Sequence, residues 1–74
     1  MKRSPVAVAT RKLVAAARKV AEAYLEQRAA AKALAEAVTL DSEQLRRASR
    51  RLTRAQKELW AAGDAFENAK AAAA

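Results

Sequence analysis

The chain has 74 residues, with 15 basic and 8 acidic side chains and a net charge of +7. This length allows one small domain, whose core supplies only about 3 to 5 kcal/mol of net stability without oligomerisation or another staple. The lack of cysteine and histidine excludes disulfides, thiolate metal sites and the usual general base, and no nucleophile has a base beside it. We therefore predict a protein that is not an enzyme and that binds no cofactor, metal or small-molecule substrate.

The first part of the chain, residues 1–21, carries six basic side chains and no acidic one. An arginine-rich, acid-poor amphipathic segment is also typical of a mitochondrial transit peptide. However, the apolar periodicity that begins here continues to residue 38, which a cleaved leader would not require. The apolar run at residues 6–9 is too short for a secretory signal, and no segment approaches the ~20 apolar residues of a membrane span. These features predict a cytoplasmic or otherwise intracellular protein.

The first predicted helix runs from about residue 5 to residue 37. Ser4 and Pro5 predict an N-cap and a first helical residue, because proline loses no hydrogen bond at that position. Large residues then recur every seven positions, each followed three positions later by an alanine, which is the spacing of a coiled-coil seam. The two series are Val6, Leu13, Val20, Gln27 and Leu34, and Ala9, Ala16, Ala23, Ala30 and Ala37. Gln27, the polar exception, either fixes the register or is a long side chain tolerated at the edge of the seam.

A second apolar strip lies beside the seam of this helix. It consists of Val14, Ala17, Ala21, Tyr24, Leu25, Ala31, Ala35 and Val38. An apolar face this wide is typical of a helix inside a bundle of three or more helices. We expect self-association, most simply two hairpins in an antiparallel four-helix bundle. The expected oligomer interface contains Val14, Ala17, Ala21, Tyr24, Leu25 and Val38. A half-exposed monomer and burial of the strip against a different protein remain alternatives.

The predicted turn covers about residues 38–41, and the second helix about residues 42–72. Asp41 is the expected N-cap, Gln44 its capping-box partner, and Leu40 and Leu45 the flanking hydrophobic staple. The heptad series continues with Leu45, Leu52, Leu59 and Phe66, and with Ala48, Ala55, Ala62 and Ala69. Gly63 lies outside this seam. It either is tolerated where a neighbour packs closely or marks a kink or a restart of the helix, with Asp64 and Glu67 as a new capping pair.

A short link between two long helices predicts that they pack antiparallel. A turn centred on Asp41 requires facing positions to sum to about 82, so that Leu34 faces Ala48 and Ala30 faces Leu52. Every layer except that of Gln27 then pairs a large apolar residue with an alanine, which keeps the layer volume constant. The predicted fold is all-α: an antiparallel two-helix hairpin, a Leu/Ala heptad coiled coil, in a single domain over residues 1–74.

Basic side chains gather on the face of the second helix that lies opposite the seam. They are Arg46, Arg47, Arg50, Arg51, Arg54 and Lys57. A charged run is often only a solvated face, but one that serves solubility alone would mix both signs, and no acid interrupts this run between Glu43 and Glu58. Trp60 lies near its end, where an indole can stack on a base, bury in a partner or flank the core.

These patterns predict a small, basic, non-enzymatic interaction module whose stripe and Trp60 bind the nucleic-acid backbone. An acidic protein surface would satisfy the same charges. Nothing supplies base readout, so binding to DNA or RNA would follow backbone and shape. The alternative is a small structural or regulatory subunit, for example of a viral particle or an inhibitor, that docks on a larger protein assembly. The strings RRAS and RRLT, at residues 46–49 and 50–53, resemble basophilic kinase sites, although a helix would hold their hydroxyls. The narrow Leu/Ala seam suits a partner helix better than an anionic membrane surface.

Overall fold

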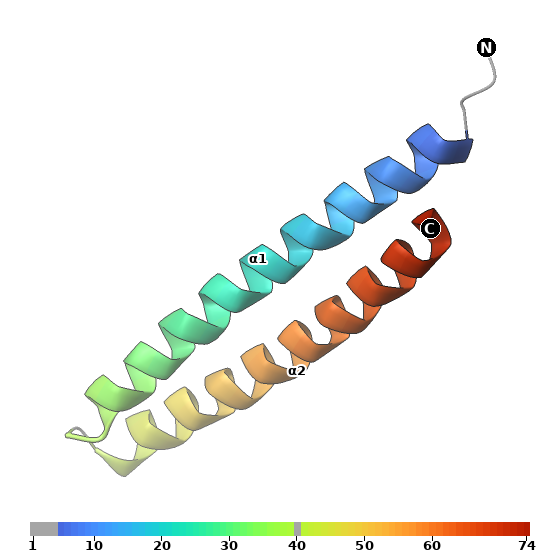
Figure 1. Ribbon diagram of the computed structural model, residues 1–74. Helices are drawn as coiled ribbons and strands as arrows, with labels where there is room; N and C mark the ends of the chain where they lie inside the picture. Colours follow the sequence, from blue (N-terminus) through green and yellow to red (C-terminus); the bar gives the residue numbers. More distant parts are fainter. Residues whose placement is uncertain (1–4, 40) are drawn as a thin grey trace.

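The structure, a computed structural model, describes residues 5–39 and 41–74. It contains two helices, α1 (Pro5–Ala37) and α2 (Ser42–Ala73), which lie side by side and run in opposite directions (Figure 1). The molecule is a rod of 58 × 17 × 15 Å, with the start of α1 and the end of α2 at one end and the link between the two helices at the other. The predicted all-α antiparallel hairpin is therefore confirmed, while its assembly into a four-helix bundle stays a prediction.

The start of α2 is defined by a side-chain cap. Asp41 has extended backbone angles, φ −77° and ψ 164°, and its Oδ1 accepts a hydrogen bond of 2.8 Å from the backbone N–H of Gln44. The capping box also predicts a hydrogen bond from the backbone N–H of Asp41 to the side chain of Gln44, and this prediction is wrong. Among the described residues the exposed Gln44 side chain makes no hydrogen bond, and water can satisfy its amide equally well. The predicted roles of Ser4 and Leu40 fall on residues outside those described.

The core of the hairpin is a single seam of small side chains. Its buried residues are Ala23, Ala30, Ala37, Ala48 and Ala55. All five belong to the alanine series predicted for the seam, and the large residues of the other series are half-buried between the helices, Val6 excepted. Within the described residues no side chain is both large and fully buried. One hairpin therefore leaves part of each large seam residue exposed to water, and Gln27 lies half-buried in the same seam.

Within one chain, Gly63 neither interrupts α2 nor packs closely against a neighbour, and a kink without a break stays a prediction. α2 continues through Gly63 to Ala73, so a break with a new start at Asp64 is wrong. A methyl group added at Gly63 would meet nothing within 4 Å, so close packing inside the hairpin is wrong as well. The glycine lies beside open space, so it affects the stability of the hairpin only through its low helix propensity.

In each helix the first half is basic and the second half is more acidic, so in the antiparallel hairpin a basic half lies beside an acidic one. Residues 5–21 of α1 carry four basic and no acidic side chains, and they lie beside residues 58–73 of α2, which carry three acidic side chains and one basic. Nearer the turn, residues 22–37 carry three acidic side chains and two basic, and residues 42–57 of α2 carry six basic and one acidic. Because opposite charges attract, this distribution favours the antiparallel arrangement over a parallel one.

Candidate interaction surfaces

Two of the six predicted stripe residues are engaged by acidic side chains. Arg51 turns toward α1, where its Nη2 and Nε donate hydrogen bonds of 2.7 and 3.1 Å to the two carboxylate oxygens of Glu26. Arg47 stays on α2 and donates from Nη2 to Oε1 of Glu43 at 2.9 Å, one helical turn earlier. Of the six cations predicted for the stripe, these two are paired, so the free cationic surface of α2 contains fewer side chains than the sequence indicated.

The pair between Glu26 and Arg51 joins the two helices along one flank of the seam. Its hydrogen bonds lower the pKa of Glu26 from its ordinary value and raise that of Arg51, while desolvation opposes both shifts. The charge of Arg54 adds a smaller lowering of the Glu26 pKa. Since both side chains remain partly exposed, water and salt screen the attraction. The pair contributes more to the alignment of the helices than to their stability.

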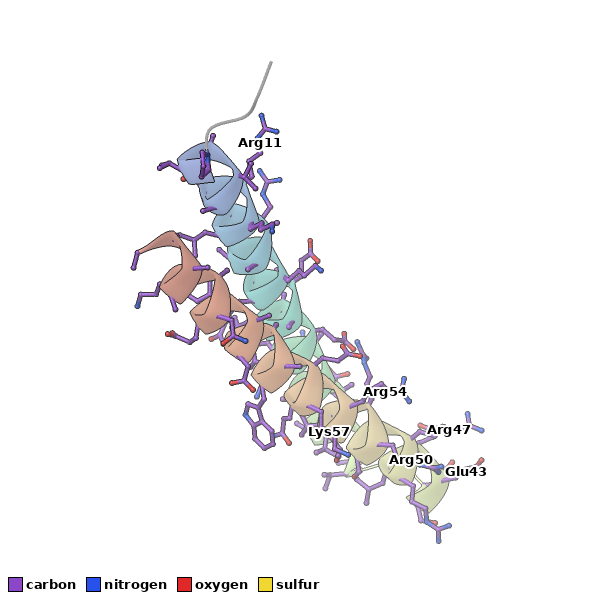
Figure 2. All side chains as sticks on the ribbon, turned by 90° about the vertical axis from the view of Figure 1, so that its right-hand side faces the viewer. Arg11, Glu43, Arg47, Arg50, Arg54 and Lys57 are labelled. Carbon is purple, nitrogen blue, oxygen red and sulfur yellow. The ribbon has the colours of Figure 1, made fainter. Side chains whose placement is uncertain are left out.

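Four cations of α2 form what we call the basic line: Arg46, Arg50, Arg54 and Lys57. Among residues 5–39 and 41–74, no acidic side chain is paired with any of them. Their spacing of four, four and three residues places them along one side of the helix over about 16 Å. Figure 2 shows Arg50, Arg54 and Lys57 projecting from α2 in its turn-proximal half. These three side chains line a shallow, open groove together with Ser49 and Thr53.

The apolar strip predicted on α1 lies uncovered. Val14 is 47% exposed, Tyr24 50%, Leu25 62% and Val38 65%, and Ala17 and Ala21 are exposed with them. The guanidinium carbon of Arg28 lies 5.9 Å from the centroid of the Tyr24 ring, within the range of a cation–π contact. No residue of 5–39 or 41–74 packs fully over this face, so in the described part of the chain the strip is open to a partner.

Trp60 is 67% exposed on α2. Within one hairpin the indole does not flank the core, because a flanking indole would be largely covered by α1. Its ring and N–H are both open to a partner. The described residues contain no group of acidic side chains that could hold a metal ion, and neither of their helices is long and apolar enough to cross a membrane.

The contact between Glu26 and Arg51 was not predicted from the sequence. A signal for it exists, because each residue directly precedes a large-series position of its helix, at Gln27 and Leu52 respectively. Residues at this heptad position flank the seam on the same side in an antiparallel pair. Periodicity alone could therefore have separated Arg51 from the basic line.

The fold and its surfaces define a class of protein: a small helical hairpin with an exposed apolar strip and an exposed basic line. A family model for the CbbQ/NirQ/NorQ C-terminal region matches residues 2–56, and the chain belongs to this family. The match includes α1, the turn and the part of α2 with the first three members of the basic line, whereas Lys57 and Trp60 lie beyond it. No curated protein and no solved structure matches the chain.

Proposed function

We propose that the chain is a non-enzymatic docking module that binds a larger protein assembly. The observation that carries this proposal is that the family match spans both exposed surfaces, the apolar strip of α1 and most of the basic line of α2. The CbbQ C-terminal domain is a part of AAA+ proteins, which are ATPases. In this proposal the hairpin contributes contacts to such an assembly and takes no part in nucleotide hydrolysis.

The two surfaces have separate roles in this proposal. The basic line binds an acidic protein surface, since charge complementarity speeds the encounter and selects the partner. The apolar strip serves self-association of the chain, because uncovered valine and aromatic side chains gain most from leaving water. The two faces point in different directions from the hairpin, so both can be occupied together.

The proposal is tested by titrating a purified CbbQ-family AAA+ protein into the chain labelled with a fluorophore at Ala74→Cys. Fluorescence anisotropy is expected to rise on binding, and the affinity to fall at higher salt. Binding should weaken at least tenfold in the double variant Arg50→Glu/Arg54→Glu. The matched control Arg11→Glu/Lys32→Glu changes the net charge equally on α1 and should bind nearly as well as the parent chain. No binding would refute the docking function, and equal weakening by both variants would refute the role of the basic line.

A second candidate is binding to the phosphate backbone of nucleic acid, and the uninterrupted basic line is the observation that favours it. Four cations that contact duplex DNA would make the affinity fall with salt at a log-log slope of about −3.6, a smaller slope than six would produce. An electrophoretic shift titration over a range of salt concentrations measures this slope. Absence of a shift at low salt would remove this candidate and leave the protein partner.

A further inference from the structure

The exposed face of α1 has the same residue order in both directions. Eight residues, spaced alternately by three and four positions, follow one line along α1. The last of them is the first residue after the helix. In chain order they are Val14, Ala17, Ala21, Tyr24, Arg28, Ala31, Ala35 and Val38. Each has a counterpart of the same type at equal distance from residue 26, except that the central two are Tyr24 and Arg28. We call this set the palindromic strip.

A palindromic line on a helix is what a two-fold symmetric contact requires. In such a contact, residue i of one copy faces residue j of the other, and j faces i. Two antiparallel α1 helices with facing positions that sum to about 52 satisfy this condition in every layer, and the alternating spacing is that of a coiled-coil seam. We infer that a second copy of this chain packs antiparallel along the palindromic strip, with the two-fold axis passing between Tyr24 and Arg28, level with residue 26 along the helix. This inference rests on the self-association proposed above and specifies its geometry.

The side chains of the strip suit this geometry. Four of its eight residues are alanines, which let two helices approach toward the short end of the ~8 to 10 Å interaxial range. At the centre each Tyr24 faces Arg28 of the second copy. Arg28 already lies over the Tyr24 ring in one hairpin, so the second guanidinium can cover the other face of the ring. The exposed Val14 and Val38 close the two ends of the contact.

One hairpin leaves enough surface uncovered for such a dimer. Its accessible surface is 5970 Å², whereas a compact monomer of 8.0 kDa exposes about 4,500 Å². The excess of about 1,500 Å² in each chain compares with the ~1,600 Å² in total that a standard interface buries. Because alanines are the only buried residues in the described part of the hairpin, the second copy supplies the apolar contact that one chain lacks.

The same two-fold axis also places the α2 helices favourably. The palindromic strip lies about a quarter turn around α1 from the seam, so the four helices form a square in which the two α2 helices are neighbours. Their facing positions then sum to about 112, with the centre at Gln56. The basic residues 42–57 of one α2 therefore lie beside the acidic residues 58–73 of the other. Trp60 lies on this inner side of α2, whereas Arg50, Arg54 and Lys57 stay outside.

Disulfide trapping tests the inferred register, because the chain has no cysteine of its own. A mixture of the single variants Ala17→Cys and Ala35→Cys is expected to form a mixed disulfide on oxidation. Either variant alone should not, since identical positions would lie about 27 Å apart in the antiparallel dimer, far beyond the ~7 Å limit between α-carbons. The exposed pair Ala15→Cys and Ala29→Cys, on another face of α1, controls for random collision and should stay reduced.

Sedimentation equilibrium of the parent chain separates the two ways in which this inference can fail. A dimer whose Ala17→Cys variant forms disulfides with itself would overturn the register and leave self-association intact. A monomer at all concentrations would overturn both.

A charge placed on the strip gives a second test. Ala21→Glu should raise the dissociation constant at least tenfold, because the symmetric contact receives two carboxylates that lose hydration at a layer packed from alanines. Ala29→Glu, at another exposed position of the hairpin, should leave the dissociation constant nearly unchanged, and equal loss in both variants would overturn the inference.

Discussion

The two helices have nearly equal length and the same Leu/Ala seam, yet their outer faces differ. α1 exposes alanines, valines, Tyr24 and Leu25, whereas the turn-proximal half of α2 exposes Arg46, Arg50, Arg54 and Lys57. The seam therefore accounts for the hairpin, and the outer faces account for what the hairpin can bind. A change in the seam should act on stability in either helix alike, while a change outside it should depend on which helix carries it.

The largest expected effect concerns the buried alanines of the seam, which should contribute equally to stability in the two helices. Ala30→Asp in α1 and Ala55→Asp in α2 each place a carboxylate where the alanine is 0% and 2% exposed, respectively. Each should destabilise the hairpin by roughly 3 to 5 kcal/mol, because a buried charge without a partner loses its hydration. Such a loss abolishes the thermal unfolding transition followed by circular dichroism. Ala29→Asp, on an exposed position, should cost only the ~0.7 kcal/mol of helix propensity.

A second prediction concerns the start of α2. Asp41→Ala removes the side chain that accepts from Gln44 N and should lower the free energy of unfolding by about 1 kcal/mol. Asp41→Asn keeps the acceptor and should restore most of it. Urea denaturation measures both, and equal stability of the parent and the alanine variant would show that the cap contributes nothing.

The glycine of α2 offers a change of similar size and opposite sign. Since a methyl group at Gly63 meets nothing within 4 Å, Gly63→Ala should stabilise the single hairpin by about 1 kcal/mol. The measurement is chemical denaturation at a chain concentration where only monomer is present. Destabilisation there would mean that α2 bends at this residue in solution.

The smallest effect concerns the pair that links the helices. Because the pKa of Glu26 is lowered in the folded chain, its ionised form stabilises the hairpin above the unfolded pKa of ~4.3, and this contribution is lost as pH falls through the folded value. Arg51 stays charged throughout this range. The melting temperature of the parent should therefore exceed that of Glu26→Gln at pH 7, and the difference should vanish in acid below the folded pKa. A difference that persists there would show that the pair acts through packing instead of charge.

Much of this protein was predictable from local sequence rules. The seven-residue repeat predicted the seam and the five alanines that the structure buries, and Asp41 predicted the start of α2. The strip of α1 and the exposed Trp60 could also be placed from helical periodicity. Helical periodicity thus assigns residues to each surface but does not give the contacts that they make.

What the sequence by itself determined is the pairing of two heptad helices about a tight turn, because helix periodicity and capping depend on neighbours within a few residues along the chain. Only the tertiary structure decided which cations stay free. Arg51 looks like the other arginines of α2 until α1 brings Glu26 within 2.7 Å of it across the seam. Tertiary contacts also decided that Gly63 faces open space and that no large side chain is fully buried in the described hairpin, because burial depends on what the opposite helix covers.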